Sequence, residues 1–176
     1  MTLSDPFSLL ALPLRYELDP ADLDRRMRRF AARLHPDRTT DPIVAAENAG
    51  RLAEMHAAAD LLRDDLKRAD RLIDLWGGPD ASSEKGLPDG FLEEMLDVRM
   101  ELESSLDSGD ELAVRRLEDW AGTEWGTRRD AVASFLDGDQ PASEGDRRSA
   151  RLEINRWRYI QRMLEQLHPS PASMDL

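Results

Sequence analysis

Apolar residues recur along most of the chain at the spacing of an α-helix, and prolines and glycines separate these stretches. One stripe lies at i, i+4, i+7 and i+11 and places its members on one helix face: Leu23, Met27, Phe30 and Leu34. No stretch shows the alternation of period two that marks a half-buried strand. The pattern therefore predicts an all-α protein.

Each of the first three predicted helices begins at an Asp-Pro pair. These pairs are Asp5-Pro6, Asp19-Pro20 and Asp41-Pro42. An aspartate can cap a helix, and proline suits the first helical position. Asp65 is positioned to cap a fourth helix, which a Gly-Gly pair at 77–78 ends. His35 precedes Pro36 and so ends the second helix, because the residue before proline avoids the α region.

Composition divides the chain into two parts. Residues 77–90 are rich in glycine, proline and serine, which is typical of a linker. Helical patterns follow at 91–108, 110–136 and from about 147 to 167, with Gly109 and a loop at 137–146 between them. We predict an N-terminal helical domain at 1–76, a linker at 77–90 and a C-terminal three-helix bundle at 91–170.

Positive charge gathers in one segment of an acidic protein. The net charge is −12, yet residues 25–38 hold six arginines and one aspartate, a local sum of +5 that leaves −17 for the remainder. Arg25, Arg29 and Arg33 align at i, i+4 and i+8 opposite the apolar stripe, with Arg26 beside them. Such like-charge pairs repel by a few tenths of a kcal/mol. A solvated face is one reading, but the pattern favours a face that binds an anionic protein.

The loop His35-Pro36-Asp37 follows this basic helix. Proline fixes φ, which stiffens the loop and lowers the entropy cost of docking. Asp37 offers a carboxylate that can accept two hydrogen bonds from an arginine of a partner. The imidazole and carboxylate thus predict a protein contact rather than a catalytic pocket.

Several classes are excluded by what the sequence lacks. There are no cysteines, which removes disulfides and thiolate metal sites. No run of about 18 apolar residues could cross a membrane, and no secretory signal is visible. Histidines and carboxylates form no cluster with metal-ligand spacing. We expect a cytoplasmic protein that is not an enzyme and has no metal or cofactor, and whose acidic remainder disfavours nucleic acid.

The helix from Phe91 carries two apolar rows. The first is a core row of Phe91, Met95, Val98 and Leu102. The second is rotated by roughly 100° or more and comprises Leu92, Leu96 and Met100, edged by Glu93 and Asp97. From the pattern alone, a wide core stripe and a partner-binding face are equally supported.

The basic helix, the His-Pro-Asp loop and the helix after it resemble a J-domain, an antiparallel helical hairpin with short additional helices. The resemblance implies docking on a DnaK-type heat-shock chaperone and stimulation of its ATP hydrolysis. The residues that it implies for this contact are Arg25, Arg26, Arg29, Arg33, His35, Pro36 and Asp37.

Longer segments resemble HscB, the J-domain co-chaperone of iron–sulfur cluster assembly. They are residues 7–13, 16–19, 66–77 and 91–102. This resemblance implies a partner ATPase of the HscA type and a C-terminal bundle that binds a client, the IscU-type scaffold. The client-binding residues that it implies are Leu92, Glu93, Leu96, Asp97, Met100 and Tyr159, whereas Trp157 is expected in the core.

The sequence departs from the HscB pattern at several positions. Residues 55–59 lack the family's aromatic residue, Asp65 replaces a proline, and Met100 and Ser104 replace acids. Alternatives therefore stay open: a J-protein with a different client, a helical adaptor in which His-Pro-Asp is incidental, or an RNA-contacting protein that uses its arginines. ATPase stimulation separates the first from the others, and a steep salt dependence of RNA binding would support the last.

Overall fold

The computed structural model describes residues 5–35, 39–82, 84–138 and 140–167, and every regular element among them is an α-helix. The all-α prediction is thereby confirmed. The chain forms two units, residues 1–77 with 136–142, and residues 78–135 with 143–176. The first unit contains α1 (Pro6–Leu9), α2 (Pro20–Leu34), α3 (Pro42–Arg63) and α4 (Asp65–Leu75). The second contains α5 (Phe91–Ser108), α7 (Glu144–Leu167) and nearly all of α6 (Glu111–Leu136).

Three helices of the first unit begin with the same device. The carboxylates of Asp5, Asp19 and Asp41 each accept a hydrogen bond from the backbone N–H two residues later, at 3.0, 2.9 and 2.8 Å. A proline occupies the first turn each time, where its missing N–H costs nothing. The predicted starts of α1, α2 and α3 are therefore confirmed. α4 differs from the prediction, because Asp64 caps it at 3.0 Å from the N–H of Lys67, while Asp65 pairs with Arg68.

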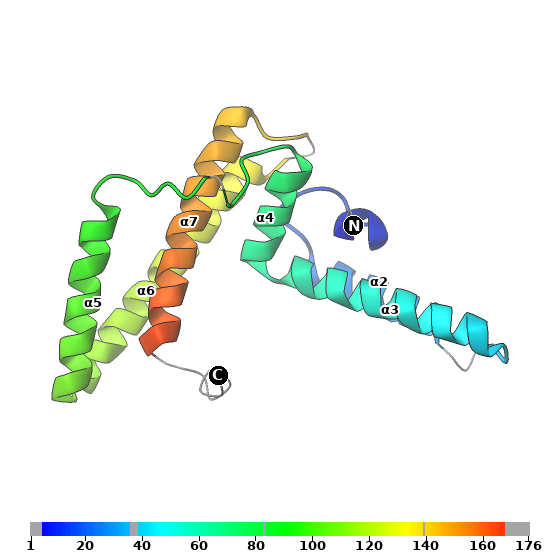
Figure 1. Ribbon diagram of the computed structural model, residues 1–176, viewed down its shortest axis with the longest axis horizontal. Coiled ribbons are helices and arrows are strands. Elements are labelled where there is room, and N and C mark those ends of the chain that lie inside the picture. Colours follow the sequence, from blue (N-terminus) through cyan, green and yellow to red (C-terminus); the bar gives the residue numbers. More distant parts are fainter. Residues whose placement is uncertain (1–4, 36–38, 83, 139, 168–176) are drawn as a thin grey trace. The chain divides into compact units, whose positions relative to one another are not determined.

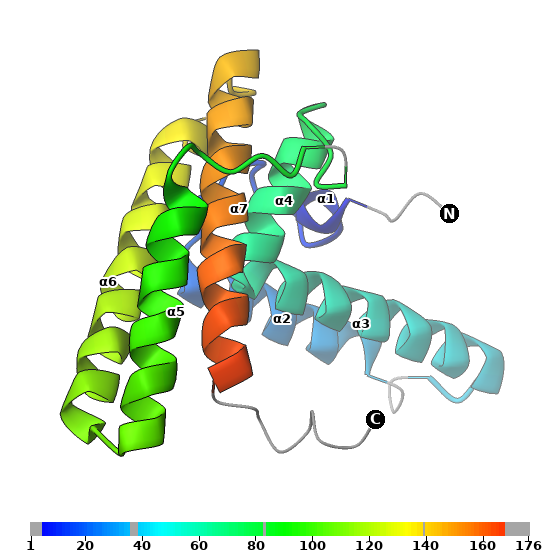
Figure 2. The ribbon, with the colours of Figure 1, turned by 60° about the vertical axis from the view of Figure 1, so that its left-hand side comes forward.

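The core of the first unit lies near α4 and thins out along the α2–α3 hairpin. Leu23 and Met27 of α2 are buried, whereas Phe30 and Leu34 are half-buried. On α3 the buried residues are all near its end, at Ala58, Ala59 and Leu62. In Figure 1 α2 lies largely behind α3, and Figure 2 shows the two helices next to each other. The hairpin thus carries the end of α2, at Leu34 and His35, away from the core.

Arg68 is buried inside the first unit. Its Nε donates to the Tyr16 carbonyl at 2.8 Å, and another guanidinium nitrogen donates to the Leu62 carbonyl at 2.7 Å. It also pairs with Asp65, and its guanidinium carbon lies 4.7 Å from the centre of the Tyr16 ring. One side chain thus ties the segment after α1 to the α3–α4 corner.

Replacing this arginine should therefore be costly. We expect Arg68→Met to lower the free energy of unfolding by about 2–3 kcal/mol, because two buried carbonyls and a carboxylate lose their donor. Lys67→Met, on the exposed side of the same helix, should change it by about 0.5 kcal/mol or less. Urea unfolding of both variants measures the difference, and equal small effects would contradict the structural role of Arg68.

The second unit is a bundle of three helices that lie side by side (Figure 2). Gly109 ends α5 with φ at 68°, a left-handed conformation that glycine adopts without strain. Two hydrogen bonds close this turn, from the N–H of Asp110 to Ser105 at 2.9 Å and from that of Gly109 to Leu106 at 3.2 Å. The predicted end of α5 at Ser108 is confirmed.

The start of α7 differs from the prediction. The helix begins at Glu144, about three residues earlier than expected, within the stretch 137–146 that we predicted as a loop. The hydroxyl of Ser143 accepts from the N–H of Asp146 at 3.1 Å and donates to its carboxylate at 2.6 Å. This reciprocal cap satisfies a free N–H of the first turn, which allows the helix to start there despite Gly145.

We predicted a linker at 77–90, and all of it except Gly77 belongs to the second unit. This segment contacts α7. The amide of Asn155 donates to the carbonyls of Glu84 and Gly86, each at 3.0 Å. The buried Arg151 donates to the carbonyl of Pro79 at 3.1 Å. These bonds fix much of the segment against the bundle.

Candidate interaction surfaces

The first candidate surface is the arginine face of α2, formed by Arg25, Arg29 and Arg33. All three side chains are exposed. Arg25 pairs with Asp22, whereas Arg29 and Arg33 form no ion pair with any residue that the structure describes. Two guanidinium groups separated by one helical turn are thus available to an anionic partner.

His35 stands at the end of this face. It is the C-cap of α2, with φ −59° and ψ 130°, so the backbone leaves the helix at this residue. The residue is exposed. Pro36 and Asp37, which complete the predicted contact, lie outside the described residues. The described part of the loop is therefore accessible and lies one residue beyond the helix of the arginine face.

Arg26 differs from its neighbours because its guanidinium is engaged within the fold. Its Nε lies 2.7 Å from Asp22, and another nitrogen donates to the carbonyl of Ala11. Ala11 holds φ at 53°, a conformation that costs a residue with a Cβ about 1 kcal/mol. The hydrogen bond from Arg26, followed by its charge and that of Arg25, lowers the pKa of Asp22 despite the opposing effect of burial. Arg26 therefore supports the turn after α1 in addition to any role in docking.

The second candidate surface is the leucine ridge on α5, formed by Leu92, Leu96 and Met100. Their exposed fractions are 54%, 56% and 60%. The neighbouring row behaves oppositely, because Phe91, Met95 and Leu102 are only 6%, 1% and 2% exposed. Packing within the bundle thus uses one row and leaves the other in solvent. The reading of both rows as one wide core stripe is wrong for the unit as it stands.

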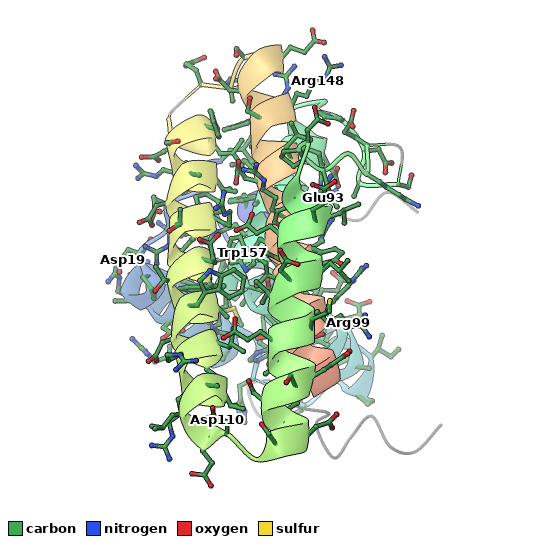
Figure 3. All side chains as sticks on the ribbon, turned by 90° about the vertical axis from the view of Figure 1, so that its left-hand side faces the viewer. Asp19, Glu93, Arg99, Asp110, Arg148 and Trp157 are labelled. Carbon is green, nitrogen blue, oxygen red and sulfur yellow. The ribbon has the colours of Figure 1, made fainter. Side chains whose placement is uncertain are left out.

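Glu93 and Asp97 each follow a leucine of the ridge by one position along α5. Glu93 and Asp97 are exposed, and Figure 3 shows Glu93 projecting from α5. Tyr159 of α7 is half-buried and packs edge-on against Phe91, with ring centres 5.6 Å apart. Trp157 is 3% exposed, which confirms its predicted place in the core. A row of three large apolar side chains edged by acids is suited to a partner helix or loop.

Two solved structures share this fold. The chaperone HscB from Vibrio cholerae superposes with a TM-score of 0.74, at 24% identity over 94% of this chain and 96% of that one. The human co-chaperone protein HscB gives the same TM-score at 20% identity, over 100% of this chain and 85% of that one. Those proteins are J-domain and helical-bundle structures, and the predicted architecture is confirmed.

Sequence comparison finds relatives with the same name as these structures. No protein-family profile matches the chain. A co-chaperone HscB homologue from Bordetella pertussis is 28% identical over 95% of this chain and 96% of its own length. Another from Vibrio cholerae is 35% identical over 56% of this chain and 59% of its own length. The chain is thus similar to HscB co-chaperones over nearly its whole length.

Both of these relatives are named as co-chaperones. No helix within the described ranges is both long and apolar enough to cross a bilayer.

Proposed function

We propose that this protein stimulates ATP hydrolysis by a DnaK/HscA-type chaperone through its first unit. The second unit delivers a client, the IscU-type scaffold of iron–sulfur cluster assembly. The observation that carries the proposal is the exposed leucine ridge on α5 beside the buried Phe91, Met95 and Leu102. A bundle that needed its leucines for folding would not leave three large apolar side chains in water.

The arginine face supports the chaperone contact. Arg29 and Arg33 present charge that no acid within the described residues neutralises, and they precede the exposed His35 on one side of the hairpin. Opposite charge on the chaperone would speed association and orient the encounter. Because exposed charges are screened within about 8–10 Å at physiological ionic strength, docking should weaken as salt is raised.

The leucine ridge supports the client contact. Burying a leucine side chain is worth about 1.5–3 kcal/mol, so two leucines and a methionine can supply the centre of a specific interface. Acidic residues at its edge, Glu93 and Asp97, then select the orientation of the client. The client is held by the second unit while the first engages the ATPase, which raises the concentration of client at the chaperone.

The direct test is ATP turnover by the DnaK/HscA-type chaperone of the same host, measured with and without the protein. We expect turnover to rise with the protein and to rise further when the IscU-type scaffold is added. A pull-down from the host identifies both partners together. Absence of stimulation would overturn the chaperone assignment, and capture of the ATPase with a different client would replace the scaffold only.

A further inference from the structure

A cavity of about 520 Å³ opens in the second unit between α5, α7 and the segment 78–90. Four cationic side chains from these three parts of the chain line it: Lys85, Arg99, Arg158 and Arg162. Among the described residues that line it, none carries a carboxylate. Like charges held close together repel, and in a chain of net charge −12 such a group is unusual. We refer to it as the cationic pocket.

The wall of the cationic pocket is held in place by the bundle. The amide of Asn155, itself a lining residue, donates to the carbonyls on both sides of Lys85, those of Glu84 and Gly86. This fixes the backbone of Lys85 against α7. The pocket is therefore a formed feature of the unit and not a chance approach of long side chains.

Nearby acids neutralise only part of this charge. The Nε of Arg99 lies 2.8 Å from a carboxylate oxygen of Glu103, and this hydrogen bond raises the pKa of Arg99. Arg162 and Lys85 are exposed and form no ion pair with any described residue. Positive charge therefore remains available at the pocket.

The cationic pocket adjoins the leucine ridge. Arg99 follows Leu96 by three residues and Leu92 by seven, so the three share one face of α5. Tyr159, which lines the pocket, packs against Phe91 at the buried edge of the same helix. Figure 3 shows Arg99 projecting from α5. A segment of a client bound along the ridge could thus continue directly into the pocket.

We propose that the cationic pocket binds a glutamate- or aspartate-bearing segment of the client that covers the leucine ridge. This inference rests on the proposed function and specifies the chemistry of its client. The apolar ridge supplies contact area, and the pocket selects a client in which an acidic segment adjoins the apolar one. Guanidinium groups suit this role because they bind carboxylates through two parallel hydrogen bonds.

The test is the affinity of the IscU-type scaffold for Lys85→Glu/Arg162→Glu, measured by titration calorimetry. We expect binding about tenfold weaker than wild type, with a smaller dependence on salt. The matched control is Arg115→Glu/Arg116→Glu, which changes the net charge equally at exposed positions on α6 away from the pocket. It should leave the affinity within about twofold. Circular dichroism and the melting temperature verify that both variants fold.

Three outcomes would overturn the inference. If Leu92→Ala/Leu96→Ala weakens scaffold binding but the pocket variant does not, the pocket does not contribute to client binding. The proposed function then stands. If the wild-type protein does not bind the scaffold at all, the proposed function falls and the inference with it. If the pocket variant loses binding of an oligouridine RNA while its scaffold affinity is unchanged, the pocket serves a nucleic acid.

Discussion

Replacing His35 by glutamine should abolish stimulation of the chaperone's ATP turnover, returning the rate to that of the chaperone alone. His35 is exposed at the point where the backbone leaves α2. Its side chain is exposed, so its replacement should change the free energy of unfolding by about 0.5 kcal/mol or less. The effect on turnover must then come from the contact with the chaperone. Steady-state ATP hydrolysis at saturating protein measures it.

His56 offers a matched control in the same unit. It is an exposed histidine on α3, and His56→Gln makes the same chemical change away from the predicted docking loop. We expect this variant to stimulate turnover as the wild-type protein does. Stimulation that survived His35→Gln, or that was lost equally in both variants, would contradict the assignment of the loop after α2 as the triggering contact.

The second large effect is expected from Leu92→Ala/Leu96→Ala. This double substitution should weaken binding of the scaffold at least tenfold, because each leucine loses about 1 kcal/mol or more of apolar burial in the complex. Both side chains are more than half exposed in the free protein. The variant should therefore keep the unfolding midpoint of the wild type, and it should still stimulate the chaperone when no client is present.

Two further leucines of the bundle distinguish binding from folding. Leu112 on α6 is 72% exposed, so Leu112→Ala should alter neither stability nor client affinity. Leu102 is 2% exposed, so Leu102→Ala should lower the free energy of unfolding by about 2–5 kcal/mol. If the Leu92/Leu96 variant unfolded as easily as the Leu102 variant, the ridge would be part of the core.

Local signals in the sequence predicted most helix boundaries because the interactions that fix them are local. Asp5, Asp19 and Asp41 each bond to a backbone N–H two residues away, so the Asp-Pro pairs were sufficient evidence. α7 starts earlier than the loop composition of 137–146 predicts, because Ser143 and Asp146 form a local cap. The serine and the acid three residues later were the available signal.

The burial of particular arginines could not be predicted in this way. Arg68 bonds to Tyr16, which lies 52 residues earlier, and Arg151 bonds to Pro79, 72 residues earlier. Helical spacing carries no information about such partners. Arg26 is a third case. Helical spacing indicates that it lies beside the arginine face, but not that it bonds to Ala11, 15 residues earlier.

The two rows of α5 show the limit of pattern analysis most clearly. Spacing identified both rows, yet it could not decide whether the bundle buries one or both, because this depends on how α5 faces α6 and α7. Packing of Phe91 and Met95 against Ala121 and Ile160 settles which row is interior. Helical spacing does not predict the cationic pocket either, since its cations come from three parts of the chain.

The central claim is that one molecule both holds the client and triggers the ATPase. Mixing His35→Gln with Leu92→Ala/Leu96→Ala supplies each activity on a separate molecule. ATP turnover of the chaperone, measured with the scaffold and subsaturating amounts of both variants, tests the claim directly. We expect the mixture to give no more turnover than the leucine variant alone. Turnover restored to the wild-type rate would contradict the account.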